Sequence, residues 1–197
     1  MNGINYTLMT EKYILKIPNK RRIIELKHEF SECGIWKLLD KNEEAVLFSS
    51  ITNKNAYVDE KGVLFLEKID AKPLSSFLEK EELFLSYFTK SMELLLVLNT
   101  EKNFVHGDFH MDNILIDDGT IFFIDYDYTY TQEYALFAPY NDVVHLLYVF
   151  KKYYPQAFQK YAMKLRIIVE KRYERNKLVE SMKKMECFFK IGYNELW

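Results

Sequence analysis

The stretch Phe104–Tyr130, FVHGDFHMDNILIDDGTIFFIDYDYTY, carries the most informative pattern in the chain. It sets acidic and imidazole side chains at the ends of two apolar runs, 114–116 and 121–124. The Asp-Gly pair between these runs is a strong turn signal for a β-hairpin. In an antiparallel hairpin the residue that enters, Asn113, and the residue that leaves, Asp125, lie at the same end. The sequence therefore predicts an amide and a carboxylate side by side at the mouth of a hairpin.

These two side chains are suited to a magnesium ion. Asn113 and Asp125 offer hard oxygen ligands, which Mg²⁺ accepts while it keeps waters and phosphate oxygens. Asp108 lies five residues before Asn113 and is expected to face the same point without binding the metal. Phosphoryl transfer requires such an arrangement, because it depends mostly on positioning a phosphate, a metal ion and an attacking hydroxyl. The alternative, an acidic surface turn, does not explain why the acidic groups flank the apolar strands at their ends.

Composition is typical of a compact globular protein. With 197 residues, about half of them apolar, the chain is expected to form one domain or two small lobes that share a cleft. Glycine and proline are scarce, which argues against disorder. The N-terminal residues do not resemble a signal peptide, and the apolar run at 94–98 is too short to span a bilayer. Two cysteines do not make a disulfide framework, so a cytoplasmic location is expected.

Apolar periodicity predicts the other elements. Two short strands before Pro18 form a hairpin. The elements expected after it are a helix over 19–33, strands over 43–51 and 55–69, and helices over 79–100, 141–154 and, in two pieces, 156–190. Strands thus fill the first third of the chain and helices the remainder. This order predicts an α+β fold over 1–197, with a β-rich N-lobe (1–66), a hinge (67–73) and a helical C-lobe (74–197).

The C-terminal quarter is basic, although the whole chain has a net charge of −2. Residues 151–197 carry 12 Lys and Arg against 5 Asp and Glu. The apolar positions at helical spacing are Phe158, Ala162, Leu165 and Ile168 or Val169, and the cations largely off that stripe are Lys160, Lys164, Lys171, Arg172 and Arg175. One interpretation is a solvated helix face that complements the acidic remainder of the chain. The other is a surface for anionic partners, here a peripheral contact with the inner face of the membrane. No nucleic-acid partner is predicted.

The motif HGDFHMDN resembles the catalytic loop of the protein-kinase-like superfamily in its phosphotransferase form. IDYDY is similar to the metal-binding segment of aminoglycoside and choline phosphotransferases and of bacterial lipopolysaccharide-core kinases. The resemblance implies that Asp108 is the catalytic base and that Asn113 and Asp125 bind the metal. It also implies that His106 braces the loop and that His110 contacts the transferred phosphate. The fold implied is a bilobal protein-kinase-like one with a reduced N-lobe, and the cofactors implied are ATP and Mg²⁺.

The same resemblance extends to the β-rich part of the chain. YILKIP is similar to the strand whose lysine holds the α- and β-phosphates of ATP, which assigns that role to Lys16. The helix glutamate that pairs with this lysine would be Glu25 or Glu29, one turn apart, and Glu25 is preferred. Asp142 matches the helix aspartate that caps the backbone of the catalytic loop, a structural role.

The adenine of ATP would bind where the lobes join. LFLEKIDAKP resembles a strand that leads into the hinge, so the backbone of Glu67 and Ile69 is expected to meet the base. Ile14 and Leu115 would hold the ring between them, and Leu66 would be the gatekeeper residue.

One feature of the superfamily is missing. Only 15 residues precede Lys16, and Gly3 is the sole glycine among them, so a glycine-rich loop over the phosphates is not expected. Two functions of different classes follow. The first is an ATP-dependent kinase that transfers phosphate to an alcohol group of a small molecule or saccharide, including a lipopolysaccharide-core glycolipid. The second is a non-catalytic kinase-like binding module, and an atypical protein Ser/Thr kinase is a further alternative.

Overall fold

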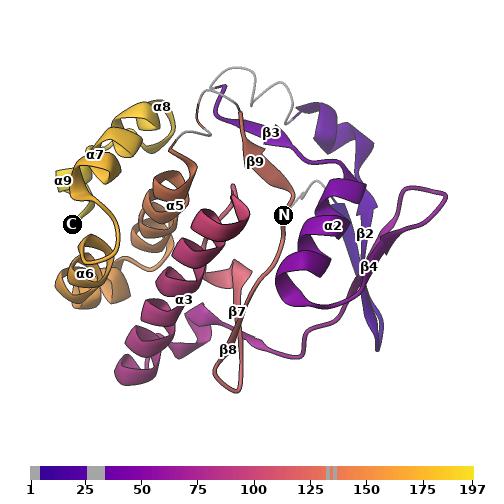
Figure 1. Cartoon of the computed structure of the whole chain (residues 1–197), viewed down its shortest axis with the longest axis horizontal. Coiled ribbons are helices and arrows are strands. Elements are labelled where there is room, and N and C mark those ends of the chain that lie inside the picture. Colours follow the sequence, from indigo (N-terminus) through magenta and orange to yellow (C-terminus); the bar gives the residue numbers. More distant parts are fainter. Residues whose placement is uncertain (1–4, 26–33, 132–133, 135–136) are drawn as a thin grey trace.

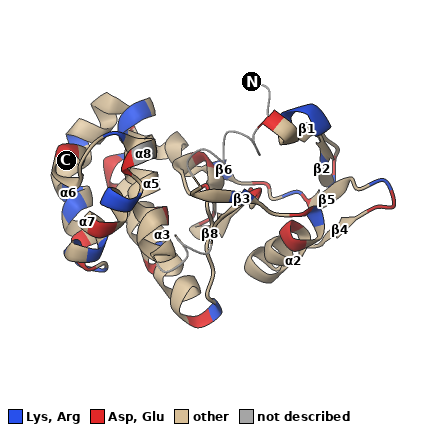
Figure 2. Cartoon of the chain, turned by 90° about the horizontal axis from the view of Figure 1, so that it is seen from above, with Lys and Arg blue, Asp and Glu red and all other residues tan. Residues whose placement is uncertain are grey.

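The structure, a computed structural model, describes residues 5–25, 34–131, 134 and 137–197. A small antiparallel sheet with helix α2 (Lys41–Thr52) beside it forms one part of the molecule, and a bundle of helices forms the other (Figure 1). Seen from above, these two parts lie at opposite ends, with β3, β6 and β8 between them (Figure 2). This arrangement confirms the α+β prediction. The lobe boundaries at 67–73 stay a prediction.

The bounds of the elements are as follows. The strands are β1 (Asn5–Met9), β2 (Tyr13–Pro18), β3 (Trp36–Leu38), β4 (Ala56–Val58), β5 (Leu64–Glu67), β6 (Lys72–Pro73), β7 (Ile114–Asp117), β8 (Thr120–Phe123) and β9 (Tyr128–Tyr130). The helices are α2 (Lys41–Thr52), α3 (Glu81–Lys102), α5 (Ala138–Tyr153), α6 (Pro155–Glu170), α7 (Arg175–Lys184), α8 (Glu186–Phe189) and α9 (Tyr193–Leu196), with short 3-10 turns at Leu74–Phe77 and Met111–Asn113. Residues 20–25 are also helical, and the rest of the helix predicted over 19–33 lies outside the described residues.

The first sheet has the strand order β1-β2-β5-β4, and all its pairs are antiparallel. The β1–β2 hairpin confirms the two strands predicted before Pro18. Because side chains alternate between the faces of a strand, Ile14 and Lys16 lie on one face of β2. Leu66 is the register partner of Ile14 on β5, so its side chain belongs to that same face.

Helix α2 contradicts the strand predicted over 43–51. Its start is fixed by a capping box, in which Asp40 accepts from the backbone N–H of Glu43 at 2.9 Å and the Glu43 carboxylate accepts from the backbone N–H of Asp40 at 3.0 Å. Ala45, Phe48 and Thr52 are buried, at helical spacing. The run AVLF is apolar enough to resemble a buried strand, but the cap and this spacing favour the helix.

The predicted hairpin at the centre of the chain is confirmed. Strands β7 and β8 pair from Ile114 to Asp117, and the two-residue turn between them has positive φ at Asp118 (43°) and Gly119 (82°). Two positive φ values are what the favoured hairpin turn requires. A further two-stranded sheet, which the sequence did not predict, pairs β3 with β9.

The helices after residue 79 agree with the predicted periodicity. The apolar stripe of α6 is buried at Phe158, Leu165 and Val169. Several cations of the basic quarter are paired across the surface. The pairs are Lys160 and Lys164 with Glu81, and Arg172 with Glu93. Among the described residues, no helix is long and apolar enough to cross a membrane.

Two histidines are buried in the core and lose affinity for protons. Burial lowers the pKa of both His106 and His145 to about 3. His145 lies on α5 against the rings of Trp36, Phe188 and Phe189, and its Nδ1 has no hydrogen-bond partner among the residues that the structure describes. A proton on either ring would place an uncompensated charge in the core.

We predict that these histidines weaken the fold in mild acid. The unfolded chain binds protons near pH 6.5 and the folded chain does not, so their contribution to stability falls as pH drops below 6.5 toward 3. Each histidine then lowers the free energy of unfolding by about 2 kcal/mol between pH 6.5 and pH 5, because it takes up a proton in the unfolded chain only. His145→Phe keeps an aromatic ring and removes the contribution of His145 to this loss of stability. Urea unfolding at both pH values should show a smaller loss of unfolding free energy in this variant than in the parent. Equal losses would contradict the assignment.

Candidate active site

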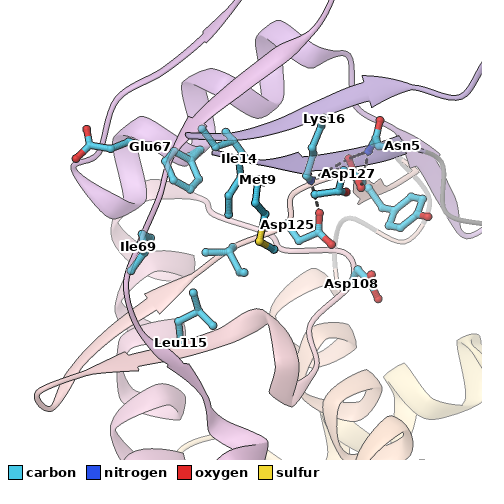
Figure 3. A pocket seen from close by; sticks show the side chains of 15 residues that line it. Asn5, Met9, Ile14, Lys16, Glu67, Ile69, Asp108, Leu115, Asp125 and Asp127 are labelled. Atoms are coloured by element: carbon cyan, nitrogen blue, oxygen red, sulfur yellow. Dashed lines mark hydrogen bonds and ion pairs between the residues drawn. The ribbon is translucent and has the colours of Figure 1, made fainter. Parts of the chain in front are cut away.

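A cavity of about 510 Å³ lies between the first sheet and the β7–β8 hairpin. Its apolar end is formed by residues of both parts of the chain, among them Met9, Ile14, Ile69 and Leu115 (Figure 3). Leu66, the register partner of Ile14, also lines the cavity. Its polar end holds Asn5, Lys16, Asp108, Asp125 and Asp127. The structure therefore brings the residues predicted to bind adenine to one end of a cavity, with the lysine and two predicted aspartates at the other.

Glu67 lines this cavity, but its carboxylate is engaged elsewhere. The carboxylate accepts from Asn55 Nδ2 at 2.6 Å and from the Asn55 backbone N–H at 3.1 Å. Figure 3 shows this side chain turned away from the other labelled residues. The backbone N–H of Glu67 is engaged as well, because it donates to the carbonyl oxygen of Asn55 at 2.8 Å. The contact between the main chain of Glu67 and the base stays a prediction.

Lys16 pairs with Glu44 of α2, and this finding corrects the prediction that Glu25 is its partner. The Lys16 ammonium donates to the carboxylates of Glu44 and Asp125, and it lies 3.3 Å from Asp127 Oδ1. Glu25 instead pairs with Arg21 at 3.1 Å and Arg22 at 3.3 Å on an exposed helix face. The other candidate, Glu29, lies outside the described residues.

A second lysine completes the charged cluster. Lys41, at the start of α2, donates to Glu44 Oε2 at 2.7 Å and to Asp127 Oδ1 at 2.8 Å. Asn5 of β1 adds contacts from Nδ2 to the two oxygens of Asp127 at 3.1 and 3.2 Å. Lys16, Glu44, Lys41 and Asp127 thus form a ring of alternating charge. The sequence did not predict Glu44, Lys41, Asp127 or Asn5 here, and the Asp40–Glu43 capping box is the signal that could have placed α2.

Burial and ion pairing act against each other in this cluster. Burial lowers the pKa of Lys16, but the carboxylates of Asp125, Asp127 and Glu44 outweigh it and hold that pKa well above the usual value. Burial raises the pKa of Glu44 to about 7, although Lys16 and Lys41 oppose the change. Burial also raises the pKa of Asp125. At Asp127 burial acts in the same direction, but Lys16 and Lys41 prevail and lower the pKa.

The loop that carries Asp108 is held by a buried aspartate on α5. Asp142 accepts from the backbone N–H of His106 and of Gly107, both at 2.9 Å, and from the Tyr130 hydroxyl at 3.1 Å. Gly107 has a φ of 82°, and a Cβ there would lie 2.6 Å from the carbonyl oxygen of Tyr128. A side chain is therefore excluded at this position. These bonds agree with the capping role expected of Asp142.

His106 braces the same loop. Its Nε2 lies 2.9 Å from the carbonyl oxygen of Ile124, and its Nδ1 accepts from the backbone N–H of Asp108 at 3.3 Å. The neutral ring that burial enforces suits both bonds, with Nε2 as donor and Nδ1 as acceptor. His106 therefore ties Asp108 to the residue that precedes Asp125, which matches its expected role.

Asn113 and His110 lie beside Asp108 without lining the cavity. The side-chain Nδ2 of Asn113 donates to the backbone carbonyl oxygen of Asp108 at 3.0 Å. The backbone carbonyl oxygen of Asn113 accepts from the N–H of Ile124 at 3.0 Å. His110 Nε2 lies 3.8 Å from Asp108 Oδ2 and borders a different cavity. Burial raises the pKa of Asp108, and His110 opposes this change.

Asn113 and Asp125 carry oxygen ligands of the kind that Mg²⁺ accepts, and a shared ion stays a prediction. The amide nitrogen of Asn113 is used by Asp108, which leaves the amide oxygen as the available ligand atom. The side chain of Asp125 is 38% exposed and borders the cavity. Glu44, Asp125 and Asp127 also offer oxygens within 4.8 Å of one another, but Lys16 and Lys41 already neutralise this group. The group by itself therefore gives no support to a second metal.

Comparison with known proteins identifies the family. The model of the RIO domain matches residues 19–182, so the chain belongs to the RIO domain family and to the protein-kinase-like superfamily. A solved structure of the gentamicin complex of APH(2'')-IIa aligns with 93% of this chain and 88% of that chain, at 16% sequence identity and a TM-score of 0.36. Comparison with curated protein sequences gives no match. The RIO domain match confirms the kinase-like fold expected from the sequence.

We predict that Glu44, and not Glu25, supports the buried lysine. Glu44→Gln at pH 8 removes the charge that Lys16 and Lys41 share, so the free energy of unfolding should fall by about 3 kcal/mol or more. Glu25→Gln is the matched control, because it breaks only an exposed pair, and it should change stability by less than about 1 kcal/mol. Urea unfolding measures both. A similar effect of the two substitutions would contradict the pairing.

Proposed function

We propose that this chain is an ATP- and Mg²⁺-dependent phosphotransferase of the cytoplasm that moves the γ-phosphate to a hydroxyl of a small molecule or saccharide. One observation carries the proposal: Asp108 borders two cavities at once. The first cavity holds Lys16 and Asp125, and the second, of about 620 Å³, lies on the side of His110 and α5. A carboxylate between two cavities can take a proton from an acceptor in one while phosphate is supplied from the other. Membership in the RIO domain family supports phosphoryl transfer in general.

In the proposed nucleotide site, Lys16 holds the α- and β-phosphates. The adenine lies between Ile14 and Leu115, beside Leu66, and meets the backbone of Glu67 and Ile69. The separation of the cavity into an apolar and a charged end supports this orientation. Asn113 and Asp125 would hold Mg²⁺, which supplies charge neutralisation for the phosphates.

The reaction proposed is a single displacement. The oxygen of the acceptor hydroxyl forms a bond to the γ-phosphorus, and the bond from that phosphorus to the β–γ bridging oxygen breaks. ADP leaves with the electron pair of the broken bond, and Asp108 takes the hydroxyl proton. The raised pKa of Asp108 increases its affinity for this proton. His110 borders the second cavity, and in this proposal it would contact the transferred phosphate from that side.

Two alternatives differ in what they require of the site. A RIO domain that acts as an atypical protein Ser/Thr kinase would present a protein side chain to Asp108, and the family match favours it over other protein-kinase types. A non-catalytic module would need neither Asp108 nor the metal ligands. The turn Thr10–Lys12 between β1 and β2 contains no glycine, which supports that module because backbone amides cradle phosphate most readily in glycine-rich loops.

Two substitutions test catalysis. Asp108→Ala should lower phosphate transfer by about 10²–10⁴-fold and leave the affinity for Mg²⁺·ATP nearly unchanged, because Asp108 acts on the acceptor hydroxyl. Asp125→Asn should instead weaken ATP binding in the presence of Mg²⁺ and abolish the gain that Mg²⁺ gives, because an amide brings no charge to the ion. Titration of ATP with and without Mg²⁺, together with ADP release, separates the two effects. Full turnover in Asp108→Ala would rule out this mechanism.

A peripheral membrane contact through α6 is a weaker part of the proposal. Met163 is 78% exposed and Ile167 63% exposed on the outer face of this helix, close in sequence to Lys160 and Lys164. Both lysines share Glu81, which reduces the positive charge they offer. We expect pelleting with anionic vesicles at low salt that weakens as salt rises, and loss of pelleting in Met163→Gln/Ile167→Gln. No pelleting at low salt would leave an acceptor in solution.

A further inference from the structure

We call the cavity on the far side of Asp108 the acceptor cavity, and its lining is rich in aromatic side chains. It is bordered by the catalytic-loop residues Asp108, His110, Met111 and Asp112, by His145, Tyr148, Val149, Phe150, Lys152, Tyr153 and Tyr154 around the C-terminal half of α5, and by Phe188. Its volume, about 620 Å³, is in the range of pockets for small ligands. It is a concave site, whereas an extended peptide requires an open groove or a free strand edge.

Three tyrosines give the acceptor cavity walls that suit a polyhydroxylated ligand. Tyr148, Tyr153 and Tyr154 each combine an apolar ring with a hydroxyl that can donate and accept. A sugar has the complementary surface, with C–H groups on the faces of its ring and hydroxyls around the edge. Phe188 adds a further apolar surface.

Lys152 is the lysine that borders the acceptor cavity, and it favours an anionic group on the ligand. Its ammonium lies 5.3 Å from the ring centre of Tyr153 and 5.9 Å from that of Tyr148. The lysine therefore occupies the ring faces that would otherwise attract a cationic ligand. Within the part of the chain that the structure describes, no salt bridge involves Lys152, whereas Lys160 and Lys164 share Glu81. The ammonium is thus available to an anionic group of a ligand.

The carboxylate of Asp112, in the wall of the acceptor cavity, already has hydrogen-bond partners. Asp112 accepts from the hydroxyl of Ser75, and the Tyr154 hydroxyl lies 3.4 Å from its other oxygen. These contacts tie the catalytic loop to the 3-10 turn Leu74–Phe77 and to the end of α5. Asp112 therefore stabilises the wall of the cavity through these hydrogen bonds. Asp108 is the other carboxylate in the lining, and it is available to the acceptor hydroxyl.

We propose that the acceptor is a sugar or similar polyol that carries a carboxylate or phosphate group. The anionic group binds Lys152, the ring lies against the tyrosines, and one hydroxyl reaches Asp108. This inference rests on the proposed phosphotransferase function and narrows its substrate class. It predicts that acceptors with an amine group are poorer substrates than acceptors with an anionic group.

Three sugars with the same ring test the charge preference. D-glucuronate, D-glucose and D-glucosamine are offered as acceptors with labelled ATP, and dephosphorylated casein serves as the protein acceptor. We expect kcat/KM for glucuronate to exceed that for glucose by about tenfold or more, the value of one hydrogen bond between charged groups. Lys152→Gln should remove this preference, and Lys152→Glu should shift it toward glucosamine. Lys171→Gln, an exposed lysine outside both cavities, is the control and should keep the parent's preference.

Several results would overturn the inference. They are a preference for glucose or glucosamine in the parent, transfer to casein alone, transfer to none of the acceptors, or a glucuronate preference that survives Lys152→Gln. Thermal unfolding of each variant confirms that it is folded. ATP hydrolysis without acceptor is measured in parallel with the parent and Asp108→Ala. If no sugar is phosphorylated as expected but ATP hydrolysis depends on Asp108, the proposed function stands and only the acceptor class is wrong. If no such hydrolysis occurs either, both the proposed function and the acceptor class are wrong.

Discussion

The buried ammonium of Lys16 is the interaction on which the arrangement of the site depends. It joins three separate pieces of chain, because its partners are Glu44 on α2 and the two aspartates that follow β8. A lysine with so little exposure remains ionised because this negative charge outweighs the effect of burial. Loss of a partner from a buried pair costs about 3–5 kcal/mol, so this cluster couples the stability of the first sheet, α2 and the segment after β8.

The catalytic loop is held by a different kind of interaction. Asp142 and His106 fix it through hydrogen bonds to backbone groups, and Trp36 adds a bond from its indole nitrogen to the carbonyl oxygen of Gly107 at 2.8 Å. These donors and acceptors are buried, and an unpaired one would be costly. The position of Asp108 is therefore determined by the main chain around it, while that of Asp125 is determined by charge.

The sequence predicted the parts of this site that are close together in the chain. Asp108 and Asp125 flank one loop and hairpin and both border the cavity, so local turn chemistry and strand pairing were sufficient to predict that they lie at one site. Glu44 was missed because the apolar run after it resembles a strand, and a helix start was not recognised in Asp40–Glu43. Lys41, Asp127 and Asn5 were missed for a different reason. Their contacts join residues up to 122 positions apart, and no local pattern records such contacts.

The short ribbon of β3 and β9 has a consequence for control of the protein. Strand β3 ends at Leu38, three residues before α2, and β9 begins at Tyr128, three residues after Asp125. Their pairing ties the helix that bears Glu44 to the segment that bears Asp125 by main-chain bonds as well as by charge. Movement of this helix away from the site therefore requires the β3–β9 pairs to break. Any control that acts by displacing Glu44 from Lys16 has to overcome these main-chain bonds as well as the ion pair.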